Sequence, residues 1–325
     1  MDRRAFIIVV GGSMLVGPLV AEAQLPGTVP RVGVIHHGGD WQLWAEGLQQ
    51  GLRELGLDEG RHLVLETRET RGDLKAVEVA ARDLERGKVT LICTAATSVT
   101  LAAKRATTQT PIVFFAGSDP VTAGLVEGFA KSGGRLTGVY NRLLDLTGKR
   151  LEILKEMIPK LARVVTFYDP GNTVAQEGAR LGRQAAQQLG VQLIERRVSS
   201  IEELRVSLQE LKPREVDAYF YTPDAMVGSQ SQLVIDAAKA KRWPTMFHEV
   251  GRVAKGASAS YGYNYREAGR MSAKYVQRIL AGAQPKDLPV EGYDKIEFAL
   301  NRRTAREIGF MIAPLLLLRA DQVVE

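Results

Sequence analysis

The sequence predicts an α/β protein with two lobes, each built on a parallel sheet. Three observations lead to this expectation. Short runs rich in β-branched residues alternate with helical patterns of ~10–15 residues, which is typical of parallel strands joined by helices. The alternation starts again after residues 140–141. The chain has 325 residues, which suits two domains at ~100–200 residues per domain.

The first alternating series covers residues 31–140. Residues 89–94 form a nearly unbroken apolar run, which is typical of a strand buried on both faces. Asp73 occupies the expected N-cap position of the second helix. The predicted elements are strands at 31–36, 62–67, 89–94, 112–116 and 136–140, and helices at about 43–55, 74–84 and 99–107.

The second series covers residues 146–248. Asn172 and Gly190 bound one predicted helix, and Ser200 with Glu203 forms a capping box at the start of another. The predicted elements are helices at 146–158, 174–189, 200–211 and 230–241, and strands at 163–168, 191–198, 218–222 and 245–248.

The last stretch has too few elements for a third domain, so we expect it to dock onto the two lobes. It contains a predicted strand at 257–261, an amphipathic helix at 265–280, a strand at 296–300 and a short tail. A chain that crosses more than once makes a hinge of several strands. The expected division is 31–140 plus 251–288 for the first lobe and 141–250 plus 289–325 for the second.

Residues 1–23 are predicted to be an export signal. Arg3 and Arg4 precede an apolar run at 5–20, and Ala21-Glu22-Ala23 offers a cleavage site before Gln24. The arginine pair suits a twin-arginine signal and an ordinary Sec signal alike, and an N-terminal membrane anchor is the alternative to both. No cysteine follows the run, which excludes lipid anchoring there. We therefore expect a periplasmic protein that is not inserted in the membrane after the signal is removed.

Composition excludes several classes of protein. The 43 Lys and Arg residues are interspersed with 37 Asp and Glu residues, and without a basic stripe no nucleic-acid partner is expected. Cys93 is the sole cysteine, so the chain holds neither a disulfide framework nor a thiolate zinc site.

Catalytic motifs are missing from the sequence. The first strand is followed by His36-His37-Gly38-Gly39-Asp40-Trp41, which lacks the dinucleotide-binding glycine spacing. Gly87-Lys88 and Gly148-Lys149 do not continue as Walker loops, and the segment 256–260 lacks the last glycine of a nucleophile elbow. Neighbouring His36 and His37 point to opposite sides of an extended chain, which disfavours a shared metal. We expect no enzyme activity, no cofactor and no metal.

Polar side chains gather at the ends of the predicted strands, where ligands bind in parallel α/β sheets. Each of them is also a residue type that caps helices, so either role is open. The set comprises Thr94, Thr97, Ser118, Asp119, Asp169, Asn172 and Asp224.

Aromatic residues and one histidine also lie at strand ends or between the series. Trp41, Tyr140 and Tyr261 either stack on a ligand or pack in a core, and His248 either lines a cleft or packs. All four are candidate ligand-binding residues.

Several spaced motifs resemble one known family over essentially the full length of the chain. They are Gly51-Leu-x-Glu-Leu-Gly56 with Glu59-Gly60, Pro111-Ile-Val-Phe with Ser118-Asp119-Pro120-Val121, Gly133-Gly134-x-Leu-Thr137-Gly138-Val139, Asn301-x-x-Thr304-Ala305-x-x-Ile308-Gly309 and Leu318-x-Arg-Ala320-Asp321-x-Val323-Val324-Glu325. The chain is similar to the periplasmic substrate-binding proteins of ABC transporters that include tryptophan-binding members. It departs from them at Ser132, where members commonly carry proline.

The resemblance implies a type I periplasmic-binding fold, with two Rossmann-like lobes, three hinge crossings and one ligand between the lobes. By position, Thr94, Thr97, Ser118 and Asp119 would contribute from the first lobe, and Asp169, Asn172 and Asp224 from the second. It also implies delivery of that ligand to an ABC permease driven by its ATPase. We expect a monomer that closes on a small polar or aromatic metabolite, such as an amino acid or another carboxylate. The alternatives are a ligand sensor for a membrane receptor and an exported enzyme on the same scaffold.

Overall fold

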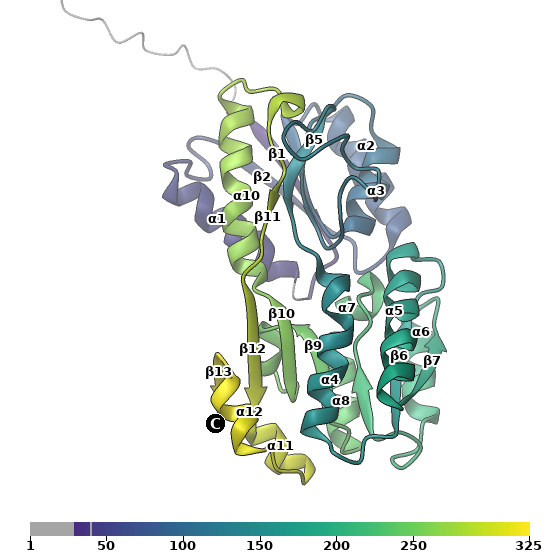
Figure 1. Cartoon of the computed structure of the whole chain (residues 1–325). Coiled ribbons are helices and arrows are strands. Elements are labelled where there is room, and N and C mark those ends of the chain that lie inside the picture. Colours follow the sequence, from purple (N-terminus) through teal and green to yellow (C-terminus); the bar gives the residue numbers. More distant parts are fainter. Residues whose placement is uncertain (1–28, 40) are drawn as a thin grey trace, which may run out of the picture.

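Two sheets form the centres of two lobes, one above the other in Figure 1. The computed structural model describes residues 29–39 and 41–325. The predicted signal at 1–23 lies outside the described residues. Among the described helices, none has the length and apolar character needed to cross a bilayer.

The first lobe contains a six-stranded sheet in which every pairing is parallel. Its strands, in spatial order, are β11 (Glu291–Gly292), β5 (Leu136–Tyr140), β4 (Ile112–Ala116), β3 (Leu91–Ala95), β1 (Arg31–His36) and β2 (Val64–Glu69). Its helices are α1 (Trp41–Glu54), α2 (Leu74–Arg86), α3 (Thr97–Ala106) and α10 (Tyr265–Leu280), with the 3-10 turn η2 (Pro285–Asp287).

The second lobe contains a seven-stranded sheet that is parallel except for the pair β10–β12. Its strands, in spatial order, are β13 (Gln322–Val324), β12 (Ile296–Asn301), β10 (Ala259–Tyr263), β9 (Thr245–Glu249), β8 (Ala218–Phe220), β6 (Arg163–Tyr168) and β7 (Gln192–Arg197). Its helices are η1 (Leu143–Leu146), α4 (Thr147–Met157), α5 (Thr173–Leu189), α6 (Ile201–Glu210), α7 (Ala225–Ser229), α8 (Ser231–Ala240), α9 (Gly251–Ala254), α11 (Arg302–Ile308) and α12 (Pro314–Arg319).

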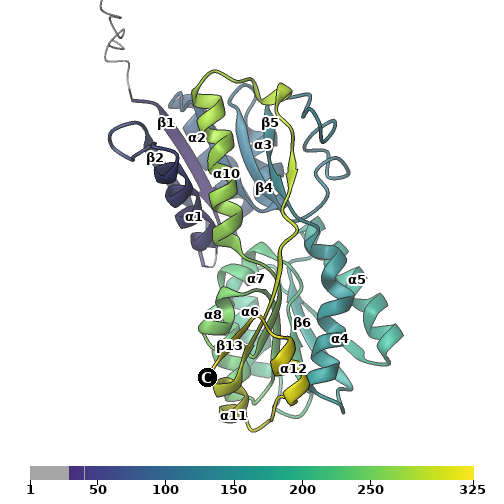
Figure 2. The ribbon, with the colours of Figure 1, turned by 60° about the vertical axis from the view of Figure 1, so that its left-hand side comes forward.

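The described chain passes between the lobes three times. The crossings follow β5, β10 and β11, and the last is visible in Figures 1 and 2 as the extended segment that runs from β11 into β12. The expected α/β class, the two lobes and the hinge of several strands are confirmed.

The sheets place two parts of the last stretch in the lobe opposite to the expected one. Residues 251–288 were expected in the first lobe, but β10 pairs with β9 and β12 in the second sheet. Residues 289–325 were expected in the second lobe, but β11 pairs with β5 in the first sheet. β11 joins a strand that is distant in sequence, which a local pattern does not encode, whereas β10 continues the second sheet beside the preceding strand β9. The short helices α7, α11 and α12 and the strand β13 were not expected.

Helices α1 and α10 pack together at unusually close range on one face of the first sheet (Figure 2). A β-carbon at Gly47 would lie 1.9 Å from the carbonyl oxygen of Arg266, and one at Gly269 would lie 2.0 Å from that of Trp44. Only hydrogen at these two positions permits the contact. The last helix of the first lobe is thereby attached to its first helix.

The capping interactions that the sequence predicts are present at the ends of three helices. Asp73 accepts hydrogen bonds from the N–H groups of Lys75 and Ala76, and Asn172 accepts one from Val174. Ser200 accepts from Glu203 N–H at 3.1 Å, while the Glu203 carboxylate reaches the N–H of Ser199. Gly190 ends α5 with a φ of 64°. These caps fix where α2, α5 and α6 begin or end.

Candidate functional site

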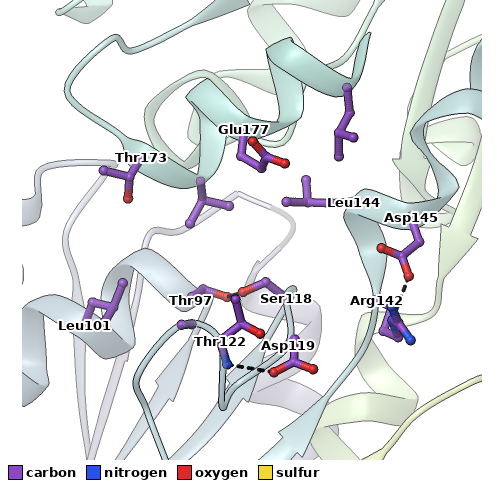
Figure 3. Close-up of a pocket in the computed structure, with 13 residues that line it drawn as sticks. Thr97, Leu101, Ser118, Asp119, Thr122, Arg142, Leu144, Asp145, Thr173 and Glu177 are labelled. Carbon is purple, nitrogen blue, oxygen red and sulfur yellow. Dashed lines mark hydrogen bonds and ion pairs between the residues drawn. The ribbon is translucent and has the colours of Figure 1, made fainter. Parts of the chain in front are cut away.

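Two adjoining cavities lie between the lobes. The inner pocket encloses about 40 Å³ and the outer groove about 480 Å³. Thr97, Leu144 and Val174 line both, so the two cavities share a wall. Figure 3 shows the outer groove, with Thr97, Ser118 and Asp119 on one side and Thr173 and Glu177 on the other.

Helix α3 of the first lobe begins at the inner pocket without a side-chain cap. Its N-cap residue is Ala96, with a φ of 87° and a ψ of 144°, a backbone conformation that costs a non-glycine residue free energy. The N–H groups of the first helical turn have no partner within the helix, and the helix dipole adds positive potential there. This end of α3 is suited to a carboxylate.

The side chain of Thr97 closes the turn beside this helix end. Its hydroxyl accepts the N–H of Gly117 at 3.0 Å and is hydrogen-bonded to the Ser118 hydroxyl at 3.0 Å. Asp119 accepts the N–H groups of Val121 and Thr122 at 2.9 and 2.8 Å (Figure 3). The polar side chains after β3 and β4 thus hold the loops that form the first lobe's wall of the cleft.

On the second lobe, the carboxylate of Asp224 lines the same inner pocket and is 3% exposed. Oδ1 accepts the N–H of Val227 at 2.8 Å, and Oδ2 accepts from the Asn172 amide at 3.1 Å and from Asp169 N–H at 3.3 Å. No Lys, Arg or His of the described chain forms an ion pair with it. Burial raises the pKa of Asp224 to about 6, although the hydrogen bonds it accepts act in the opposite direction. The inner pocket therefore holds a buried carboxylate that is not paired with a cation of the described residues.

Aromatic rings cover the remaining wall of the inner pocket. Trp41 stacks on Tyr265 with 4.6 Å between ring centroids, and Tyr221 stacks on His248 at 5.0 Å. The Trp41 indole nitrogen is buried and has no hydrogen-bond partner among the described residues. The Tyr221 hydroxyl donates to the carbonyl oxygen of Asp224 at 2.7 Å, which fixes this ring beside the carboxylate.

A buried ionic cluster lies behind the ring of Tyr221. The guanidinium of Arg252 stands 4.8 Å above that ring and donates to Glu249 at 2.6 Å. Burial alone would raise the pKa of Glu249, but the charges of Arg252 and His248 lower it to about 2. Burial lowers the pKa of His248, whereas the neighbouring Glu249 carboxylate acts in the opposite direction. The cluster fixes the rings without adding a free cation to the described pocket wall.

Residues 32–324 match the sequence profile of the family described as ABC transporter substrate binding protein. This chain belongs to that family. Substrate-binding proteins of ABC transporters bind small molecules and act with ABC permeases.

Curated and solved proteins agree with this assignment. The chain is 25% identical, over 264 residues, to a tyrosine-binding protein of Clostridioides difficile strain R20291, which covers 81% of this chain and 75% of that protein. A conserved domain protein of Vibrio cholerae is 26% identical with a TM-score of 0.82, and covers 91% of this chain and 99% of its own. An ABC domain in complex with L-Trp from Streptococcus pneumonia is 23% identical, with a TM-score of 0.80 and the same coverage. These neighbours confirm the type I periplasmic-binding fold.

The structure brings most of the predicted site residues of this substrate-binding protein to the cleft. Those that line the inner pocket or the outer groove are Trp41, Thr97, Ser118, Asp119, Asn172, Asp224 and His248. Asp169 touches Asp224 through its N–H group, but its carboxylate accepts the N–H of Gly171 and lines a separate surface groove with Arg71. Their contact with a ligand stays a prediction.

Besides Asp169, three expected residues line neither cavity. Thr94 is buried in β3, and its hydroxyl is hydrogen-bonded to Thr100 at 2.9 Å. Tyr140 packs against Phe129, and Tyr261 packs against Phe298 next to the core of the second lobe. Alternate residues of a strand face opposite sides of its sheet, so a position near a strand end does not place a side chain in the cleft.

Sequence reasoning missed several lining residues. Ala96 carries no chemistry of its own, and Tyr221 and Tyr265 stood inside expected elements. Glu177 lies one turn into α5, four residues after Thr173 and on the same face of the helix, and this spacing could have predicted it.

His36 and His37 are both buried. The Nδ1 atom of His36 accepts the backbone N–H of Gly38, and that of His37 accepts the backbone N–H of Gly72. No group of three or more His, Cys, Asp or Glu that could hold a metal occurs in residues 29–39 and 41–325.

Proposed function

We propose that this protein binds an α-amino acid between its lobes and delivers it to an ABC importer. One observation carries the proposal. The uncapped start of α3 from the first lobe and the unpaired carboxylate of Asp224 from the second line a single pocket. An α-amino acid carries a carboxylate for the first and an ammonium for the second.

The size of the cleft indicates a large side chain. The inner pocket, at about 40 Å³, suits the charged head of the ligand, and the adjoining outer groove of about 480 Å³ has room for a ring. Leu101, Leu144 and Leu181 give this groove apolar walls. The names of two similar proteins, a tyrosine-binding protein and a domain in complex with L-Trp, support an aromatic amino acid.

Hinge closure follows from the division of the site. A ligand whose two charges contact different lobes binds the closed arrangement more tightly than the open one, and it shifts the population toward closure. The three crossings provide the hinge. In this structure Gly72 of the first lobe lies against Met226 of the second, since a β-carbon at residue 72 would lie 2.4 Å from the Met226 α-carbon.

The cellular role follows from family membership and the N-terminal segment. We expect export to the periplasm, a monomeric protein after signal removal, and transfer of the bound amino acid to a permease driven by its ATPase. A binding role without chemical change to the ligand is consistent with the solute-binding relatives.

Calorimetry with the mature protein, unfolded and refolded to remove bound ligand, tests the proposal. L-tryptophan and L-tyrosine should bind, whereas their carboxamides and N-acetyl derivatives should bind about 100-fold more weakly, because each lacks one charge. Asp224→Asn should lose affinity to a similar extent, while Asp236→Asn on the exposed face of α8 should not. Equal affinity for tryptophan and its two derivatives, or no binding of any amino acid, would overturn the proposal.

A further inference from the structure

Asn141 has a buried side-chain amide with no hydrogen-bond partner among the described residues. The residue is 1% exposed, and both Nδ2 and Oδ1 lack a partner. By contrast, the polar side chains of Thr97, Asn172 and Asp224 in the same region are all hydrogen-bonded. Leaving an amide buried without partners costs folding free energy, so its presence calls for an explanation.

Asn141 lies next to two residues of the inner pocket, although its own side chain lines neither cavity in this structure. Its backbone N–H donates to the carbonyl oxygen of Ala116 at 2.9 Å, which holds the residue beside Gly117. Oδ1 lies 3.9 Å from the point that a β-carbon on Gly117 would occupy, and Leu143 lies 3.8 Å from the same point. Gly117 and Leu143 both line the inner pocket. Residue 117 has no side chain, so the pocket wall next to the amide is backbone at that residue.

We propose that the Asn141 amide is a ligand-binding group of the inner pocket and contacts the polar head of the bound amino acid. A carboxamide offers two N–H donors and an acceptor oxygen, and an α-amino acid head has both an acceptor carboxylate and a donor ammonium. This inference rests on the proposed function. It adds a neutral group to the start of α3 and the Asp224 carboxylate. Neither the strand-end pattern nor the family motifs had indicated this residue.

The contact also ties the ligand to the hinge. Asn141 is the first residue after β5, in the first of the three crossings between the lobes. A hydrogen bond from the ligand to this residue acts on the segment whose backbone angles change on closure. Asn141 is thus a ligand contact that belongs to the hinge itself.

Asn141→Leu separates a binding role from a structural one. The substitution keeps the size of the side chain and removes the unpaired amide, so we expect unchanged or higher stability in urea. Affinity for L-tyrosine and L-tryptophan should fall by about tenfold or more. Asn301→Leu is the matched control, since this buried amide donates to Val253 and accepts from Thr304, both at 2.7 Å, in the second lobe. It should lose stability clearly.

Gly117→Ala provides a second variant at the pocket wall. Its added methyl group would stand 3.8–3.9 Å from its neighbours, which is ordinary contact, so folding should be unaffected while affinity falls. The inference is overturned if Asn141→Leu binds both amino acids as tightly as the wild type, or if it loses stability as Asn301→Leu does and keeps its affinity. If the wild type itself binds no amino acid, the proposed function fails. If the wild type binds and Asn141→Leu binds equally well, only the inference about Asn141 fails.

Discussion

The Nε2 atom of His248 lies 2.6 Å from the phenolic oxygen of Tyr265, and this hydrogen bond joins the two lobes. His248 lies in β9 of the second sheet, whereas Tyr265 begins α10, which packs on the first. Both side chains are almost fully buried and both line the inner pocket. The link therefore lies where the chain crosses the hinge and where the ligand is expected.

Tyr265→Phe should loosen this link. The variant keeps the ring that stacks on Trp41 and loses the hydroxyl, so we expect a stability loss of about 1 kcal/mol and a larger radius of gyration for the ligand-free protein. Urea unfolding and small-angle X-ray scattering measure the two effects. Tyr219→Phe is the control, because the buried Tyr219 hydroxyl has no partner among the described residues. A radius identical to that of the wild type would show that the bond does not hold the lobes together.

The affinity for an amino acid should depend on pH through Asp224. Its pKa in the folded protein is raised from 3.8 to about 6, and only the ionised form attracts an ammonium group. Affinity for L-tryptophan should therefore fall about tenfold between pH 7.5 and pH 5, and calorimetry in matched buffers measures it. In Asp224→Asn the remaining weak affinity should not change over this range; a slope equal to that of the wild type would assign the titration to another group.

The same group should lower the stability of the ligand-free protein as pH rises from about 4 to about 6. The folded state keeps the Asp224 proton longer than the unfolded state, so its contribution is full below the unfolded pKa of 3.8 and is lost through about pH 6. The loss amounts to about 3 kcal/mol. His36, His37 and His248 act in the opposite direction, because burial lowers the pKa of each below 6.5. The contribution of Asp224 is therefore isolated by comparing the unfolding free energies of the wild type and Asp224→Asn in urea at each pH. If the difference between the two proteins is the same at pH 7 as at pH 4, the prediction is contradicted.

Gly72→Ala should interfere with closure. A β-carbon at this position would lie 2.4 Å from the α-carbon of Met226 in the other lobe, so we expect ligand affinity to fall about tenfold or more. The φ of Gly72 is +87°, which adds a strain of about 1 kcal/mol to the variant. Gly60→Ala carries the same strain at a φ of +82° with no atom within 4 Å, and it should keep its affinity. Calorimetry on both variants isolates the effect of the contact, and equal affinities would exclude it.

Gly47→Ala should destabilise the first lobe. The added methyl group would meet the carbonyl oxygen of Arg266 at 1.9 Å, so α1 and α10 must separate, at a cost of about 3 kcal/mol in urea unfolding. Gly148→Ala in α4 is the opposite case, since its nearest neighbour would lie 4.0 Å away and alanine favours the helix by about 0.5–1 kcal/mol. Similar stability changes in the two variants would argue against the close packing.

The order of elements was predictable because its signals are local. The strands at Arg31–His36, Ile112–Ala116 and Arg163–Tyr168 and the helix at Tyr265–Leu280 were expected with the bounds that the structure shows. Side chains of consecutive residues carry the alternation, and caps such as Asp73 and Asn172 act on N–H groups two or three residues away.

The site was predictable only in part, because strand ends indicate a region and not a direction. Thr94 and Thr97 are three residues apart, yet only Thr97 lines the cleft, since the Thr94 hydroxyl turns to Thr100 inside the first lobe. Asp224 was a candidate among several caps. Asp224 differs from the other caps because its carboxylate is buried without a cation of the described residues. Hydrogen bonds from the Asn172 amide and from the first turn of α7 hold it there.

Residue order alone was enough to predict two parallel α/β units and a substrate-binding family, since periodicity, caps and spaced motifs act over a few residues. The lobe to which β11 belongs, the meeting of α3 with Asp224, and the isolation of the Asn141 amide came from the folded chain. Each depends on groups far apart in sequence that come together through sheet pairing and burial. Desolvation and pairing energies of this kind exist only after those distant segments are in contact.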